Sequence, residues 1–450
     1  MVIVRANLTT RLVTHMLPRP SHASLAVALL VATAGVGAQP HSATPTWSKD
    51  VAPILYRNCT VCHRKGGMGP MSLVTYDDAR RSAGEMRDAI GTGFMPPWHA
   101  DAPHGTFSND RRLTDAEKNT VLAWIDGGTP QGNPADAPAA PVYASSWQLG
   151  TPDAVLKMPE PFEVPAKGTI EYQYVEIPTN FTEDKWVQAI EMLPGAREVV
   201  HHVIVYARPP APPSGAAPAP AAAPGAPRTP PLMFFNDAHL AQQEPRDPNR
   251  PQRRTGPMIA GMAPGTEIQY FPAGTALKVP AGAVLTLQMH YTAHGHAMKD
   301  QTQIGFRFAD GPPTEEIRAG TFVNNVFVLP AGNAEVEVPS EVGFRREVRI
   351  WGILPHTHLR GKKWEYRVVY PDGRKEMILS VPKYDFNWQT YYMFAKPVVL
   401  PAGAKIEARA WYDNSAANPA NPDPKVDVRW GDQTWEEMQF TAFLYTIGRP

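Results

Sequence analysis

Cysteine is almost absent from this 450-residue chain, which contains only two. Both lie in the pentapeptide Cys-Thr-Val-Cys-His at residues 59–63. When that motif uses both thiols, no cysteine remains for a structural disulfide, a catalytic thiolate or the thiolate ligand of a blue-copper site. Any further redox chemistry must therefore rely on nitrogen, oxygen or thioether ligands.

Net charge and long apolar runs are also missing. Lys and Arg number 43 and so do Asp and Glu, so the charge balance does not favour nucleic acid or an anionic membrane surface. The apolar run Leu25 to Ala34 is much shorter than a bilayer span. It follows an arginine-containing stretch and precedes the small-residue cleavage site Val36-Gly37-Ala38, with Met16 as an alternative start. We therefore expect a signal peptide at 1–38 and a secreted or periplasmic protein that is not an integral membrane protein.

The cysteine motif itself indicates a cofactor. C-x-x-C-H is typical of covalent haem c attachment, in which the sulfurs of Cys59 and Cys62 bond the vinyl groups and His63 ligates the iron. A thioredoxin-like redox site and half of a zinc site are the alternatives. The first expects a βαβ context and the second a further ligand pair nearby.

Residues 44–133 are predicted to form a small helical domain around this motif. Asp50 to Tyr56 has a helical apolar pattern, and Thr114 to Glu117 is a capping box that opens a second helix, which Gly127-Gly128 ends. The region resembles a class I cytochrome c, in which an N-terminal and a C-terminal helix pack together around the haem.

Between those helices, Met95 lies where a second axial haem ligand is expected. A methionine in that position raises the haem potential, which suits electron relay. Met68, Met71 and His99 are competing candidates.

The rest of the chain has the character of a β protein. Its 49 prolines favour turns and strands over long helices, and short alternating stretches such as Val203 to Tyr206 and Leu285 to Met289 are separated by Pro-Ala-Gly turns. We expect antiparallel sandwiches after an Ala/Pro-rich linker. The predicted segments are the linker at 134–155, a first sandwich at 156–311 with a Pro-rich insertion at 209–231, and a second sandwich at 312–450.

Three histidine clusters stand in the β region. His356 and His358, two residues apart, point the same way from a strand and form a natural chelate for copper or zinc, with a pair of surface histidines as the alternative. Adjacent His201 and His202 face opposite sides of a regular strand, so they bind one ion only at a strand end or a bulge. His290 ends an alternating apolar strand, where a buried core histidine is the alternative.

From about Lys157 onward the chain resembles the copper type II, ascorbate-dependent monooxygenases, the family of peptidylglycine alpha-hydroxylating and dopamine beta-monooxygenases. The resemblance covers about two-thirds of the chain. The stretches that carry it are, in order, Val-Val-His-His at 199–202, Leu-Gln-Met-His-Tyr at 287–291, His-Thr-His at 356–358 and Gly-Asp-Gln-Thr-Trp-Glu-Glu-Met at 431–438.

The resemblance implies two jelly-roll sandwiches, each with one copper, that face each other across a solvent-filled cleft. The first copper would have three histidine ligands, and the second would bind O2 and attack a substrate C–H bond. The implied ligand sets are His201, His202 and His290 for the first copper and His356, His358 and Met438 for the second.

The chain departs from that family at three places. Both cysteines are committed to the haem motif, so the disulfides of the animal enzymes are absent. Leu354 stands where the peptide-hydroxylating members have a carboxylate-binding arginine, and Phe440 and Ala442 replace their asparagine and tyrosine. We therefore expect a less polar substrate than a glycine-extended peptide.

The sequence thus predicts a multidomain chain, in which a cytochrome c-like helical domain precedes two β-sandwiches. The expected function is that of a secreted copper monooxygenase with two copper ions and one haem c. Its partners are a small-molecule substrate, O2 and an ascorbate-like reductant or redox protein. The alternatives are a non-enzymatic haem and copper electron-transfer or copper-binding protein, and a structural β module that holds no copper.

Overall fold

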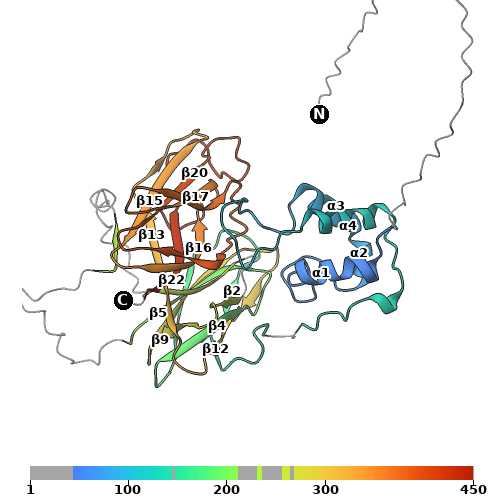
Figure 1. Cartoon of the computed structure of the whole chain (residues 1–450), viewed down its shortest axis with the longest axis horizontal. Coiled ribbons are helices and arrows are strands. Elements are labelled where there is room, and N and C mark those ends of the chain that lie inside the picture. The colour runs from blue at the N-terminus through green and yellow to red at the C-terminus, as the bar shows by residue number, and fades with distance from the viewer. Residues whose placement is uncertain (1–43, 144–146, 211–230, 236–255, 264–267, 449–450) are drawn as a thin grey trace, which may run out of the picture. The chain divides into compact units, whose positions relative to one another are not determined.

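A computed structural model describes residues 44–143, 147–210, 231–235, 256–263 and 268–448 (Figure 1). The predicted signal peptide at 1–38 and most of the insertion at 209–231 lie outside this range. Thr44–Pro450 forms one compact unit, built mostly of β-sheet with a few helices near its beginning. Among the described helices, none combines the length and apolar character that a bilayer crossing requires.

The helices surround the cysteine motif and share one small core. Thr114 caps the last helix, and its side chain and that of Glu117 complete the predicted capping box. Trp47 and Trp124, from the first and last helices, pack with ring centroids 6.0 Å apart, so the two ends of this segment meet as expected. The helical elements are a π-helix at Trp47–Val51, α1 (Ala52–Asn58), α2 (Tyr76–Arg81), α3 (Ala83–Thr92), α4 (Asp115–Asp126) and a 3-10 turn at Pro134–Asp136.

A nine-stranded sheet runs through the whole β region. Its strands are antiparallel except for β9 and β13, which pair in parallel and join the half that follows the helices to the C-terminal half. The two predicted sandwiches therefore share a continuous sheet. In order, its strands are β1 (Ala154–Lys157), β12 (Gln303–Phe308), β4 (Lys185–Leu193), β9 (Thr275–Val279), β13 (Glu315–Asn324), β22 (Gln439–Ile447), β16 (Val348–His356) and β19 (Tyr392–Leu400), with β8 (Ile268–Tyr270) beside β4.

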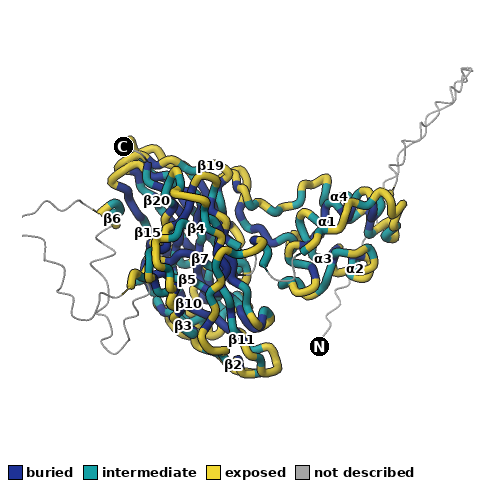
Figure 2. Tube along the Cα trace, turned by 90° about the horizontal axis from the view of Figure 1, so that it is seen from below, coloured by how far each residue is buried: buried dark blue, intermediate teal, exposed yellow. Residues whose placement is uncertain are grey.

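Two further sheets supply the other layers of two hydrophobic cores (Figure 2). The first contains β3 (Gln173–Pro178), β10 (Val284–Tyr291), β5 (Val200–Arg208) and β7 (Met258–Met262). The second contains β18 (Lys375–Val381), β17 (Gly361–Val369), β20 (Lys405–Tyr412), β15 (Val336–Phe344) and β6 (Met233–Phe235). Two short pairs complete the β structure, β2 (Phe162–Val164) with β11 (Met298–Asp300) and β14 (Val328–Leu329) with β21 (Val428–Arg429).

The sequence pattern explains these layers. In β20 the even-numbered residues from Ile406 to Tyr412 are buried while the intervening ones are half-buried, which is the two-residue period of a strand with one face on a core. The Pro-Ala-Gly turns hold Gly274, Gly282 and Gly403 at positive φ, a conformation that glycine adopts without strain.

Three segments pack elsewhere than their predicted domain. Trp98 to Phe107, expected in the helical domain, belongs to the core of the C-terminal sandwich, where Phe107 bridges to Phe394. Trp147 and Leu149, expected in the linker, pack with the first sandwich: the Trp147 ring lies against Gly305, and Leu149 N–H donates to Glu191 at 2.9 Å. Strand β6 follows the Pro-rich insertion yet pairs with β15 of the second sandwich.

Candidate functional site

A β-bulge explains how two adjacent histidines reach one place. In the β5/β10 pair, His290 is opposite His202 but the next residue, Tyr291, is opposite Val200. His201 is therefore the extra residue of the bulge, which turns its side chain toward the same side as that of His202. Sequence analysis required a strand end or a bulge for His201 and His202 to bind one ion, and the structure has the bulge.

His201, His202 and His290 form the candidate metal cluster. Their ligand atoms all lie within 4.8 Å of one another, and among the described residues this is the group that satisfies that criterion for histidine, cysteine and carboxylate ligands. His202 Nδ1 is 3.3 Å from the Nδ1 atoms of both other rings, so the three rings meet through their Nδ1 atoms.

Burial keeps these imidazoles neutral. It lowers the pKa of His201 to about 4 and that of His290 to about 3, and it drives the pKa of His202 well below its usual range. Neighbouring positive charge adds to the effect. At neutral pH each ring therefore offers a lone pair to a metal, and no proton must first be released.

The second histidine pair sits at the end of β16. His356 is the last residue of the strand and His358 lies just beyond it, with ring centroids 5.2 Å apart. His356 Nδ1 donates to Gln389 Oε1 at 3.0 Å, and His358 Nδ1 donates to the carbonyl oxygen of Glu436 at 3.1 Å. Because both acceptors fix the proton on Nδ1, the lone pairs are on Nε2.

The Nε2 atom of His358 is a buried polar atom with no hydrogen-bond partner in the described structure. Such an orphaned acceptor is costly in a protein interior unless something else binds it. Burial also lowers the pKa of His358 to about 3 and that of His356 to about 4. The pair therefore fits a metal that binds at Nε2.

Met438 joins this pair through the loop before β22. It lines the same cavity as His356 and His358, together with His202 from the first cluster. The cavity has a volume of about 460 Å³. Four of the six residues that the resemblance implies as copper ligands thus line one cavity, and the other two, His201 and His290, cluster with His202.

Phe386 lies between the two sets. Its ring stacks on His201 with centroids 5.4 Å apart and contacts His358 and His356 at 5.9 Å and 6.3 Å. The His201 and His356 rings are consequently at most about 12 Å apart, since both lie against the same side chain. The Phe386 ring therefore lies where the resemblance implies a cleft between the two histidine sets.

The 460 Å³ cavity is lined by apolar residues at two of the positions from which the sequence predicted an apolar substrate surface. Leu354 and Phe440 both line it, together with His356 and Met438. Ala442 pairs with Leu354 in the β16/β22 ladder and is fully buried.

The cysteine motif has its own supporting contacts. His63 Nδ1 donates to the carbonyl oxygen of Met71 at 3.3 Å, which leaves Nε2 free as a ligand. A Cβ at Gly69 would lie 2.6 Å from His63 Nδ1, so only glycine permits this close approach. Burial raises the pKa of the Cys59 thiol to about 12, the opposite of the low pKa that a redox-active C-x-x-C pair needs.

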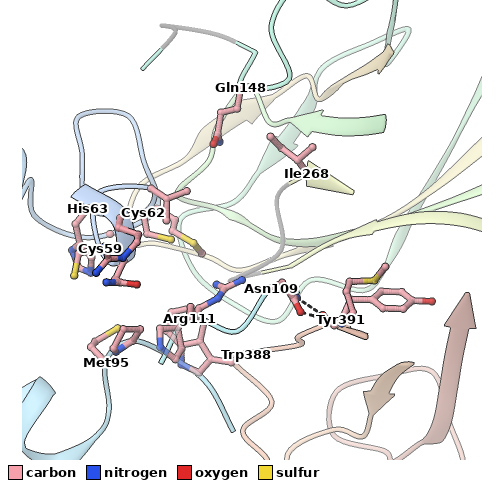
Figure 3. Close-up of a pocket in the computed structure, with 18 of the residues that line it drawn as sticks. Cys59, Cys62, His63, Met95, Asn109, Arg111, Gln148, Ile268, Trp388 and Tyr391 are labelled. Atoms are coloured by element: carbon pink, nitrogen blue, oxygen red, sulfur yellow. Dashed lines mark hydrogen bonds between the residues drawn. The ribbon is translucent and has the colours of Figure 1, made fainter. Parts of the chain in front are cut away.

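These residues line a cavity of about 1100 Å³, shown in Figure 3. Met95 lies across it from Cys59 and His63 (Figure 3). Met68 and Met71 also line it, but they belong to the loop whose Met71 carbonyl accepts from His63 Nδ1. That loop therefore lies on the same side of the cavity as His63. His99 is not among the lining residues. The geometry therefore favours Met95 as the residue opposite His63.

Sequence reasoning missed the residues that support the histidine pair and Met438. Gln389 and Phe386 belong to the β18–β19 loop, in which the Tyr384 hydroxyl also donates to the carbonyl oxygen of Thr357 at 3.0 Å. Glu437 is fully buried beside Met438, and burial raises its pKa to about 7. The sequence signal for this support is the adjacent acidic pair Glu436-Glu437 immediately before Met438.

Neither a family model nor a curated protein matches this chain. Among solved structures, the major capsid protein P2 of bacteriophage PM2 is similar at 9% identity and a TM-score of 0.24, over 65% of this chain and 97% of that one. An allantoicase is similar at 9% identity and a TM-score of 0.15, over 56% and 81%. A Paenibacillus xanthan lyase is similar at 10% identity and a TM-score of 0.16, over 71% and 28%. Likenesses at these scores assign neither fold family nor function.

Proposed function

We propose that this chain is a secreted copper monooxygenase that hydroxylates a C–H bond of a small organic substrate. In this proposal the helices at 44–133 form a cytochrome c-like domain, and the β region forms two jelly-roll sandwiches. The observation that carries it is the pair of nitrogen donor sets, one with three Nδ1 atoms and one with two Nε2 atoms, beside one cavity.

The donor sets fit copper. Imidazole serves both oxidation states of copper, and a thioether such as that of Met438 favours Cu(I). When bound, two copper ions supply one-electron redox chemistry and the activation of O2 at the Met438 set. The overall reaction places one oxygen atom of O2 in the substrate C–H bond and releases the other as water, with two electrons and two protons from a reductant.

The side chains around the ions have definite tasks. Gln389 and Glu436 hold the Nδ1 protons of His356 and His358, so the rings keep their orientation and cannot rotate to offer the wrong nitrogen. Phe386 packs against a histidine of each set. These contacts preorganise the donors before any ion binds.

The substrate would bind against the apolar side chains that line the 460 Å³ cavity. Leu354 and Phe440 offer no cation to a carboxylate, so a hydrocarbon group adjacent to the reacting C–H bond is the better fit. A glycine-extended peptide would leave its carboxylate unpaired there, which is costly.

The haem motif supplies an electron inlet. A bound haem carries one electron at a time, as each copper does, and its donor is an ascorbate-like reductant or a redox protein. Cys59 and Cys62 would hold the haem covalently, and His63 and Met95 would bind its iron. The segment that follows Met95 is anchored to the second sandwich, where Asn109 Nδ2 donates to the Tyr391 carbonyl at 2.6 Å.

The proposal is tested with the full chain exported to a bacterial periplasm. Ethylbenzene serves as an apolar probe, with ascorbate as reductant and isotopically labelled O2. Label in the resulting alcohol, from a protein with two coppers and one haem, supports the proposal. Tight copper binding without labelled product from ethylbenzene or a panel of similar apolar molecules favours the electron-transfer alternative.

A further inference from the structure

The loop Gly431–Met438 is docked onto the turn His358–Arg360 by one carboxylate. We propose that Glu437 is a positioning residue that holds the thioether of Met438 in register with the imidazole of His358. This inference rests on the proposed copper function of the site, because it assigns Glu437 a role through two of the ligands.

The contacts run from a single buried side chain to both ligand-bearing segments. Glu437 Oε2 accepts the backbone N–H of His358 at 2.7 Å and that of Met438 at 3.2 Å. Its Oε1 accepts the backbone N–H of Arg360 at 2.6 Å. The residue is fully buried, so these three donors have no water to replace it.

Two backbone carbonyls of the loop add further contacts to the same turn. The carbonyl oxygen of Glu436 accepts from His358 Nδ1, and that of Trp435 accepts from Arg360 Nη1 at 3.0 Å. Arg360 is itself buried, and its Nε donates to Asn414 Oδ1 at 2.8 Å. In all four contacts between them the turn donates and the loop accepts, and Glu437 accepts two of the four.

The ionised carboxylate satisfies this geometry. It offers acceptors on both oxygens and no donor, whereas the amide nitrogen of glutamine would point two N–H groups at the backbone N–H groups it must accept. Glu437→Gln therefore leaves at least one buried N–H unpaired and pushes the loop away from the turn. Glu437→Asp keeps the acceptors but shortens the reach by one methylene.

The expected result is a selective loss at one metal position. Changes to residues that orient metal ligands typically cost about 10–100-fold in affinity. We expect Glu437→Gln to weaken Cu(I) binding at the Met438 position by that factor and to remove sulfur from the copper coordination shell. We expect Glu437→Asp to give a smaller loss, and the tris-histidine position to keep its affinity.

Glu436→Gln is the matched control. Its side-chain Oε2 accepts only the N–H of Gln433 within the loop, while the contact to His358 is made by the backbone, which the substitution leaves in place. This variant should retain the wild-type copper affinity and the sulfur ligand.

The experiment titrates Cu(I) into the full-length metal-free proteins against a competing chelator and records copper X-ray absorption of the loaded forms. Near-UV circular dichroism of the metal-free variants checks that they are folded. If Glu437→Gln does not fold, Glu437→Asp takes its place in the comparison. Loss of the Cu–S contribution and weaker binding in the folded Glu437 variant, with both retained in Glu436→Gln, supports the inference. Unchanged Cu–S scattering and affinity in that variant overturns this inference alone, whereas a wild type without Cu–S scattering overturns the proposed function as well.

Discussion

His202 and His290 face each other across the β5/β10 pair with their Nδ1 atoms 3.3 Å apart. The bulge at His201 brings a third ring to within 3.3 Å of the same atom of His202. Three neutral nitrogen donors that converge inside a β-sandwich have no evident role in stability. This convergence is the basis of the first prediction.

Removing one donor should remove one metal ion. We expect His202→Ala to lower the copper content from two to one per chain, because two imidazoles retain a first-row ion far less tightly than three. Metal analysis after dialysis measures this, with the haem absorbance as an internal count of protein. Two coppers in the variant would show that the cluster is not a copper site.

The metal-free protein should lose stability as the pH falls below 6.5. Unfolded histidines take up protons near pH 6.5, whereas burial lowers the pKa of folded His201 and His356 to about 4 and of His290 and His358 to about 3. The unfolded state therefore binds more protons between these values, so the stability that these neutral histidines contribute is full above pH 6.5 and is lost progressively toward pH 3.

Thermal unfolding across this pH range measures the effect. His290→Gln, which takes up one proton fewer on unfolding, should show a shallower decline. An equal slope in the wild type and this variant would contradict the assigned burial of His290.

Met95 should set the haem potential without holding the haem. Met95→Ala is expected to retain covalent haem through Cys59 and Cys62 but to lower its reduction potential by on the order of 100 mV, because a thioether ligand stabilises the reduced iron. Met71→Ala is the matched control, since Met71 contacts His63 through its backbone carbonyl. A reduction potential that falls in Met71→Ala and not in Met95→Ala would assign the second iron ligand to Met71 instead.

An introduced cation should change the substrate preference. Leu354→Arg places a guanidinium in the apolar wall of the 460 Å³ cavity. We expect at least a ten-fold loss of kcat/KM for ethylbenzene, because burial of an unpaired charge is costly. Leu354→Met, similar in volume and apolar, should stay close to the wild type. Ordinary turnover of a glycine-extended peptide by the wild-type protein would refute the apolar assignment.

Local patterns were enough to predict the elements but not how they assemble. The strand around Leu285 to Met289, the capping box at Thr114 and the turn at Gly403 each follow from a few adjacent residues, and the structure contains all three. The placement of Trp98 to Phe107 in the second core, and of β6 on β15, depends on contacts between residues more than 100 positions apart. No short pattern encodes such contacts.

The same distinction holds at the site. His201 and His202 could be recognised as a chelate only on the condition of a bulge, which depends on the opposing strand at His290. Phe386 belongs to no recognised motif, and Glu437 lies in the 431–438 stretch without a role that its neighbours in sequence assign. Their importance comes from what the fold places beside them, and only the structure shows that.

The central claim is that Met438 completes a copper position at which O2 reacts. The most direct measurement is oxygen uptake by the full-length protein with ascorbate and ethylbenzene, compared between the wild type and Met438→Ala at a known copper and haem content. We predict two coppers and one haem in the wild type, and a fall in substrate-dependent uptake of at least about 100-fold in the variant with haem unchanged. Equal uptake by both proteins, or a wild type that binds haem and no copper, would contradict the account.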